Sequence, residues 1–181
     1  MIHPSPIVGQ KISLRMVEPS DCNSTYLGWL NNPEVNQYLE TRWEEQTLEK
    51  INAFVQDVRE SSHSILFAIV FEGRHVGNIK IGPIHPIYRY ADISYFIGDT
   101  TAWGKGIATE AVRLVTHFGF TTLGLHRCQA GVLAPNVGSR KALERNGYRQ
   151  EATYRQKTFI HRGDAYVDSY FYGILAHEWT P

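Results

Sequence analysis

The sequence predicts one α/β domain, a mixed and mostly antiparallel twisted sheet flanked by helices. The order of its segments is the main reason: a strand, helices, several strands, and then strand, helix, strand, helix, strand, strand. The length of 181 residues suits one domain, and no repeat, low-complexity tract or linker divides it, so residues 1–181 are expected to fold as a unit. Hydrophobic residues make up 43% and charged residues 20%, as is typical of a soluble globular protein.

The first half of the chain predicts a strand, helical segments and a hairpin. The alternation in "QKISLRMV" favours a strand over residues 10–17. A turn-rich, weakly helical stretch follows, in which Pro33 suits the first turn of a helix. Thr47 can cap the next helix, "TLEKINAFVQDVRE", whose apolar stripe contains Leu48, Ile51, Phe54, Val55 and Val58. "SILFAIVF" and "RHVGNIKIGPI" then predict two strands joined by a turn at "EGR".

The second half predicts strands that alternate with two helices. "YADISYFIG" favours a strand, and a helix over residues 105–120 follows it, with an apolar stripe of Ile107, Ala111, Leu114, Val115 and Phe118. "HRCQAGVLA" predicts a strand and "NVGSRKALERN" a helix that Gly147 ends. "YRQEATYRQ" and "AYVDSYFYGIL" close the chain as strands, linked by a turn around residues 162–164.

Charge and composition exclude several classes of protein. Lys plus Arg equals Asp plus Glu at 18 each, so there is no basic field for nucleic acid or an acidic membrane. The longest apolar run, Ile65 to Phe71, is too short to span a bilayer, and "MIHPSPIVGQ" lacks a signal pattern. Cys22 and Cys128 form no metal-type pair, and the eight histidines show no HExxH spacing, so no metal site is implied. A reduced, cytoplasmic protein is the expectation.

A glycine-rich loop stands directly before the helix of residues 105–120. Gly104 and Gly106 flank Lys105 in "WGKGIATEA". The first backbone N–H groups of a helix lack helical partners, and glycines allow a ligand to approach them closely. With the helix dipole, these groups favour a phosphate or pyrophosphate. The alternative is a tight turn without a ligand; the spacing fits neither a P-loop nor G-x-G-x-x-G, whose third glycine position holds Thr109.

Two segments carry a family resemblance. "WGKGIATEA" resembles the acyl-CoA loop Q/R-x-x-G-x-G/A of the GNAT superfamily of N-acetyltransferases, through Trp103 (where Gln or Arg is usual), Gly106 and Ala108. "LHRCQAGVLAPNVGSRKALERNGYRQE" resembles a segment of its RimJ/RimL-like branch, through Asn136, Ser139, Leu143, Gly147 and Tyr148. The resemblance covers roughly residues 11–175 and is strongest over residues 77–151.

The resemblance implies acetyl-CoA as co-substrate, held between two splayed central strands, "ADISYFIG" and "RCQAGVLA". The pantetheine would lie beside the backbone of Phe96 and Ile97, and Asn136 would hydrogen-bond it. The pyrophosphate would sit on the loop amides. The implied binding residues are Phe96, Ile97, Trp103, Gly104, Lys105, Gly106, Ile107, Ala108, Thr109, Asn136 and Ser139. Lys105, Arg140 and Lys141 are candidates for the outer phosphates, or belong to an ordinary solvated surface.

The implied chemistry is direct attack of a neutral amine on the thioester. A backbone N–H near Ile97 suits the oxyanion. Asp92 is the nearest acid on that strand and a candidate base, although a structural Asp and a water chain are open alternatives. Alternation groups Asp92 with Ser94 and Phe96 on one face of the strand. Many relatives protonate the thiolate with a Tyr where this chain has Leu143; Ser139 is the candidate replacement, or a surface helix Ser.

The acceptor is expected to be a small-molecule or peptide amine, either an amino-sugar nucleotide or a protein N-terminus. The loop "GPIHPIYRY", residues 82–90, is expected to border its site. We expect a monomer or homodimer, with neither nucleic acid nor membrane as partner. A different class remains open, a non-catalytic acyl-CoA-binding sensor or scaffold, against which the presence of Asn136 and Ser139 argues.

Overall fold

The computed structural model describes residues 4–160 and 165–180 and contains an eight-stranded mixed sheet. The strand order is β1-β2-β3-β4-β5-β6-β8-β7, and the only parallel neighbours in this described sheet are β5 and β6. The strands are β1 Ile7–Val8, β2 Ile12–Met16, β3 Ile65–Phe71, β4 Arg74–His85, β5 Tyr90–Ile97, β6 Arg127–Leu133, β7 Arg149–Ile160 and β8 Ala165–Leu175. The predicted fold class is therefore confirmed.

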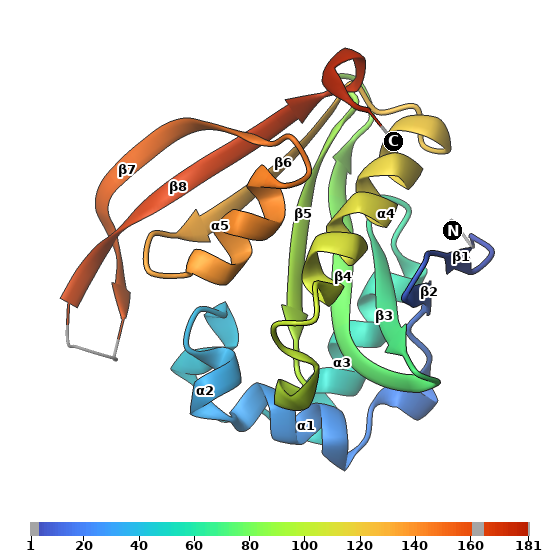
Figure 1. Cartoon of the computed structure of the whole chain (residues 1–181). Coiled ribbons are helices and arrows are strands. Elements are labelled where there is room, and N and C mark those ends of the chain that lie inside the picture. Colours follow the sequence, from blue (N-terminus) through green and yellow to red (C-terminus); the bar gives the residue numbers. More distant parts are fainter. Residues whose placement is uncertain (1–3, 161–164, 181) are drawn as a thin grey trace.

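Helices cover both faces of the sheet. They are α1 Ser24–Asn31, α2 Pro33–Asn36, α3 Leu48–Glu60, α4 Ile107–Thr121 and α5 Val137–Glu144. In Figure 1, α4 and α5 lie in front of the sheet and α3 lies behind it. The central strand β3 shows why its sequence is apolar throughout: Phe67 and Ile69 belong to the core under α4, whereas Leu66 and Ala68 belong to the core under α1 and α3.

Local signals for helix ends are borne out. The Thr47 side chain accepts the N–H of Lys50 at 3.3 Å and caps α3, and Pro33 is the first residue of α2. Gly147 follows α5 with φ +79°, a left-handed conformation that favours glycine. The predicted stripe of α4 is buried at all five positions: Ile107, Ala111, Leu114, Val115 and Phe118.

Some expectations differ from the structure. The stripe of α3 is narrower than predicted: Ile51, Val55 and Val58 are buried, but Leu48 and Phe54 are 38% and 42% exposed. Phe54 instead lines the cavity described below, so its side chain faces that cavity and not the core. The short β1 was not predicted, and β7 is longer than predicted. The turn expected around residues 162–164 lies outside the described residues.

The parallel pair β5–β6 positions the site. Only Tyr90, Ala91 and Asp92 of β5 pair with β6, opposite Arg127, Cys128 and Gln129 respectively. Beyond Asp92 the two strands separate, and Figure 1 shows them meeting at the top of the sheet and diverging downwards. The expected splay between the central strands is therefore present.

Candidate functional site

A cavity of about 950 Å³ opens where β5 and β6 diverge. Its wall takes Ser94, Tyr95 and Phe96 from β5 and residues 130–133 from β6. Asn136 and Ser139 contribute from the start of α5, and the segments around α1, α2 and α3 close the opposite side. The structure therefore brings Phe96 of β5 together with Asn136 and Ser139 in one hollow, whereas Ile97, Asp92 and the glycine-rich loop do not line it.

The edge of β5 that faces the gap has backbone groups free of β6. The N–H of Gly98 donates to Val76 O at 2.8 Å, so the backbone of Gly98 faces β4. Because backbone groups alternate in direction along a strand, those of Ile97 point to the other edge. There the Trp103 Nε1–H donates to Ile97 O at 2.9 Å, which leaves the Ile97 N–H as a donor towards the gap. Such groups require a partner, which an extended amide chain can provide.

The glycine-rich loop lies at the start of α4. Gly104 and Gly106 have φ values of +76° and +81°, and Gly106 is the N-cap residue of the helix, without a side chain over its first N–H groups. The Lys11 ammonium donates to Lys105 O at 3.2 Å, so this cation, which sequence reasoning missed, lies against the loop. Uncovered amides, a helix dipole and a nearby cation fit an anionic group such as a pyrophosphate.

The other predicted binding residues of the loop differ in how far their side chains are exposed. Trp103 and Lys105 are exposed, Ala108 and Thr109 are half-buried, and the Ile107 side chain belongs to the core, so Ile107 can offer only its backbone. Glu110, on the same helix, accepts the N–H groups of Gln10 and Lys11 and thereby fixes the β1–β2 turn. The role of Glu110 is therefore structural.

The three candidate cations for outer phosphates differ in their contacts. Arg140 Nη1 donates to Ala134 O at 3.3 Å, and its guanidinium lies 5.2 Å from the Tyr170 ring centroid, so protein contacts hold it. The Lys105 ammonium lies 5.3 Å from the Phe71 ring, and Lys141 is exposed on α5. Lys105 and Lys141 are the two that remain exposed to a ligand.

Asn136 and Ser139 are organised by the start of α5. Asn136 Oδ1 accepts the Ser139 N–H at 3.2 Å and caps the helix, which leaves the Asn136 amide N–H groups for other partners. The Tyr95 hydroxyl lies 3.0 Å from Ser139 O and 2.9 Å from Ser139 Oγ. Burial raises the pKa of Tyr95 to about 12, so its phenol is neutral near neutral pH. Tyr95 was not predicted, because nothing in the sequence pairs it with Ser139.

Asp92 lies at the closed end of the gap. Its Oδ1 accepts a hydrogen bond from Gln129 Nε2 at 2.8 Å, across the last residue pair of β5 and β6. It shares a face with Ser94 and Phe96, as alternation predicted, and the Phe96 ring packs on Tyr26 at 6.1 Å. Ser94 and Phe96 line the cavity, whereas Asp92 does not.

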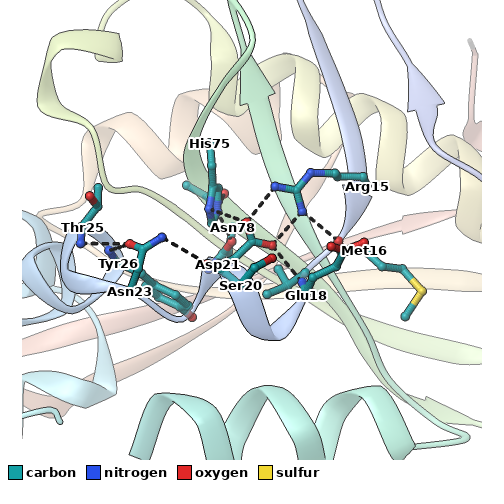
Figure 2. A network of polar contacts seen from close by, with 12 residues as sticks. Arg15, Met16, Glu18, Ser20, Asp21, Asn23, Thr25, Tyr26, His75 and Asn78 are labelled. Carbon is teal, nitrogen blue, oxygen red and sulfur yellow. Dashed lines mark hydrogen bonds and ion pairs between the residues drawn. The ribbon is translucent and has the colours of Figure 1, made fainter. Parts of the chain in front are cut away.

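A polar cluster behind the cavity holds Asn78 in position (Figure 2). Arg15 forms two contacts of 2.7 Å with the Asp21 carboxylate, and Asp21 Oδ1 lies 3.6 Å from His75 Nδ1. His75 Nε2 lies 2.7 Å from Asn78 Oδ1 and 3.0 Å from Gly77 O; since both are acceptors, this nitrogen carries the proton. Burial lowers the pKa of His75, although the bond to Asn78 and the charge of Asp21 oppose the shift.

The cluster leaves one donor directed away from His75. Asn78 is 2% exposed and lines the cavity beside Tyr26. Since Asn78 Oδ1 faces His75, its Nδ2 is the remaining polar atom, and among the described residues it has no partner in hydrogen-bonding geometry. Tyr26 lies near enough for this amide to oppose the rise in its phenol pKa, which burial nevertheless raises to about 12. A buried donor without a partner is unusual and points to a ligand atom.

The loop of residues 82–90 lies at the closed end of the β5–β6 pair, where His85 stacks on Tyr88 and Tyr90, and none of its residues lines the cavity. It does not border this hollow, because the strands are still paired beside it. Within residues 4–160 and 165–180, no cluster of three or more His, Cys, Asp or Glu residues could hold a metal. No helix in that part is both long and apolar enough to cross a bilayer.

Comparison with known proteins identifies the family. Residues 11–149 match the acetyltransferase (GNAT) domain. The chain belongs to the GNAT acetyltransferase family. Its relatives include the probable N-acetyltransferase YjcK of Bacillus subtilis, 46% identical over 90 residues, which is 49% of each chain, so this chain matches about half of YjcK. The ribosomal-protein-serine acetyltransferase of Escherichia coli is 27% identical over 132 residues, 73% of this chain and 72% of that protein.

Solved GNAT structures share the fold. RimL, a ribosomal α-N-protein acetyltransferase in complex with coenzyme A, superposes with a TM-score of 0.82 at 21% identity, over 94% of this chain and 98% of RimL. Spermidine N-acetyltransferase from Vibrio cholerae, in complex with CoA and spermine, gives 0.82 at 21% identity, over 93% and 97%. At these identities the likeness concerns the fold, and the two proteins differ in acceptor.

Proposed function

We propose that this GNAT domain transfers the acetyl group of acetyl-CoA to a primary amine. The observation that carries the proposal is the juxtaposition of the unpaired edge of β5 at Ile97 with the glycine loop at Gly106, which offers one surface for amides and another for phosphates. Acetyl-CoA is the co-substrate with both groups. That two structural neighbours were solved with CoA supports this choice of ligand.

The reaction consists of one bond exchange. The nitrogen lone pair of the neutral amine attacks the thioester carbonyl carbon, and the C–S bond breaks to release the CoA thiolate. The amine nitrogen loses its proton and the thiolate gains one, so charge and atoms balance. The Ile97 N–H, directed to the gap, suits the developing oxyanion, since a preorganised donor is worth more to the transition state than to the ground state.

Ser139 is proposed as the donor to the thiolate. Its hydroxyl contacts the neutral Tyr95 phenol at 2.9 Å, and both residues line the cavity. Because either oxygen can donate in this contact, a proton that passes from Ser139 Oγ to the thiolate can be replaced by that of Tyr95, and Tyr95 then takes one back from the water that received the proton of the amine. Tyr95 thus provides from β5 a phenol that the sequence lacks at Leu143.

For deprotonation of the amine, we favour a chain of water molecules over Asp92. The Asp92 carboxylate is bonded to Gln129 and lies outside the cavity wall, which suits a structural role better than that of a base. The acceptor itself is proposed to be a small-molecule or peptide amine.

The function is tested by acetyl-CoA calorimetry and by thiol release with amino sugars, polyamines and peptide N-termini. Binding with turnover of one acceptor supports the transferase. Tight binding of CoA without release for any acceptor would favour the sensor or scaffold. The absence of CoA binding would overturn the proposal itself.

A further inference from the structure

The wall of the cavity is strongly cationic. Its ionised residues are Arg42, Lys50, Lys80 and Lys157 against, among the described residues, Glu40 as the only carboxylate. The Lys50 ammonium lies 2.7 Å from the Glu44 carboxylate and forms an ion pair with it. The other three are here called the cationic wall (Arg42, Lys80 and Lys157), and among the described residues they have one carboxylate contact between them: Arg42 Nη1 lies 3.4 Å from Glu40, whose side chain is 82% exposed. Arg42 also lies 4.3 Å from the Trp43 ring centroid and the Lys157 ammonium 4.7 Å from that of Tyr154, contacts that bring no negative charge. A carboxylate in water offsets little of a buried positive charge.

Arg42 is the most buried member of this wall. Its side chain is 4% exposed, and it donates to Leu39 O at 2.6 Å and to Phe159 O at 3.2 Å, which fixes the guanidinium in the cavity. Its Nε has no hydrogen-bond partner among the described residues. A nearly buried guanidinium without a close, buried carboxylate is costly unless an anion binds near it.

Lys80 lines the cavity from β4. It is half-buried on β4, opposite Leu66 of β3 and Ser94 of β5, and within the described residues no carboxylate forms an ion pair with it. Asp92 lies on the same face of β5 as Ser94, but its carboxylate accepts a hydrogen bond from Gln129 and forms no ion pair with Lys80 among the described contacts. Asn78 lies two residues before Lys80, so both side chains stand on the same face of the strand, about 7 Å apart along it.

The ammonium of Lys80 and the unpaired Nδ2 of Asn78 therefore provide two neighbouring donors in one cavity. Resting on the acetyltransferase proposed above, we propose that the acceptor amine carries an anionic group, a phosphate or a carboxylate, which binds to Lys80 and Asn78 in the field of Arg42. The same charges destabilise an ammonium and so favour the neutral form of the amine that attacks. A polyamine, in contrast, would place several positive charges against this wall.

The experiment measures acceptor binding to the protein saturated with CoA, so that the loop at Gly106 is already occupied. Calorimetry compares glucosamine 6-phosphate with glucosamine, and glycylglycine with glycylglycinamide. Within each pair the amine is the same, so the first pair tests the effect of a phosphate and the second that of a carboxylate. Spermidine is the polycationic probe. We expect at least one member with a phosphate or carboxylate to bind about tenfold or more tightly than the counterpart that lacks this group, as is usual for charged hydrogen bonds.

Variants assign the effect to the wall. Lys80→Gln should remove the preference for the anion, and Lys80→Arg should keep most of it. Lys50→Gln should also keep it, because the Lys50 ammonium is engaged in an ion pair with Glu44. Equal binding within both pairs, preference for spermidine, no binding of either anionic probe, or an anion preference that survives Lys80→Gln would each overturn the inference. If CoA binds but only acceptors without an anionic group are acetylated, this inference fails and the proposed function stands. Loss of CoA binding in the unaltered protein would overturn the proposed function instead.

Discussion

The Tyr95 hydroxyl lies 2.9 Å from Ser139 Oγ and joins β5 to the first turn of α5 beside the cavity. We expect Ser139→Ala to lower kcat by the equivalent of about 2–3 kcal/mol, as loss of a transition-state donor does, with nearly unchanged acetyl-CoA Kd. Tyr95→Phe should lower kcat through the same route, so the double variant should be little worse than the poorer single one. Steady-state kinetics with saturating acceptor and calorimetry of acetyl-CoA measure both.

Asn136→Ala is the comparison for this pair. It removes the cap of α5, which costs about 1 kcal/mol of stability, and, in the proposed complex, a donor to the pantetheine. It should therefore raise the acetyl-CoA Kd more than it lowers kcat. Full kcat in Ser139→Ala would assign the protonation to water or to another residue.

Gly106→Glu should abolish CoA binding. It puts a side chain and a negative charge on the N-cap of α4, in a left-handed conformation that costs an ordinary residue about 1–2 kcal/mol. Gly124→Glu is the matched control, because Gly124 also has positive φ, +62°, and lies beyond the opposite end of α4. Calorimetry on folded proteins compares them; an unchanged CoA affinity in Gly106→Glu would remove the loop from the site.

Asp92→Asn should leave kcat within about threefold of the original protein across neutral and alkaline pH, since Asn can still accept from Gln129 and a water chain moves the proton. A fall of about 100-fold at neutral pH is what loss of a general base produces. That result, in a full pH–rate profile with a saturating acceptor, would restore Asp92 as the base.

Acid should destabilise the protein through His75. Burial lowers the pKa of His75 below its usual 6.5, so between that value and the lower folded pKa the unfolded chain binds a proton that the folded protein does not. The free energy of unfolding therefore falls as pH drops below about 6.5, by at most about 1.4 kcal/mol per pH unit. Urea titrations between about pH 7 and pH 5 measure the slope.

His75→Gln is the control for this slope, since its amide can still donate to Asn78 Oδ1 but does not titrate. Its slope should be smaller than that of the original protein over the same range. Asp21 acts at lower pH: although burial opposes the shift, Arg15 lowers the pKa of this carboxyl from 3.8. Equal slopes in the two proteins would contradict the assignment to His75.

Local sequence determines much of this fold. Thr47, Pro33 and Gly147 act through their immediate neighbours, and the stripe of α4 follows from helical spacing, so these features could be predicted. The splay of the central strands came from the family resemblance, because no local pattern states where two strands stop pairing.

Contacts between distant segments could not be predicted. Tyr95 and Ser139 are 44 residues apart, and the contact depends on how α5 packs against β5. Nothing in the sequence distinguishes Arg15, Asp21 and Asn78 from other polar residues, because only the fold brings them together around His75. The exposure of Phe54 likewise depends on the cavity that α3 borders, and the spacing of apolar residues in a helix does not show where a cavity will form.

The short seam between β5 and β6 has a mechanical consequence. Three residue pairs join the half of the sheet that contains β1 to β5 to the half formed by β6, β8 and β7. In the proposed complex the amides of the pantetheine take the place of the backbone hydrogen bonds that β5 and β6 do not form, so the bound co-substrate bridges the two halves of the sheet. Departure of CoA would leave these three residue pairs as the backbone pairing between the two halves of the sheet.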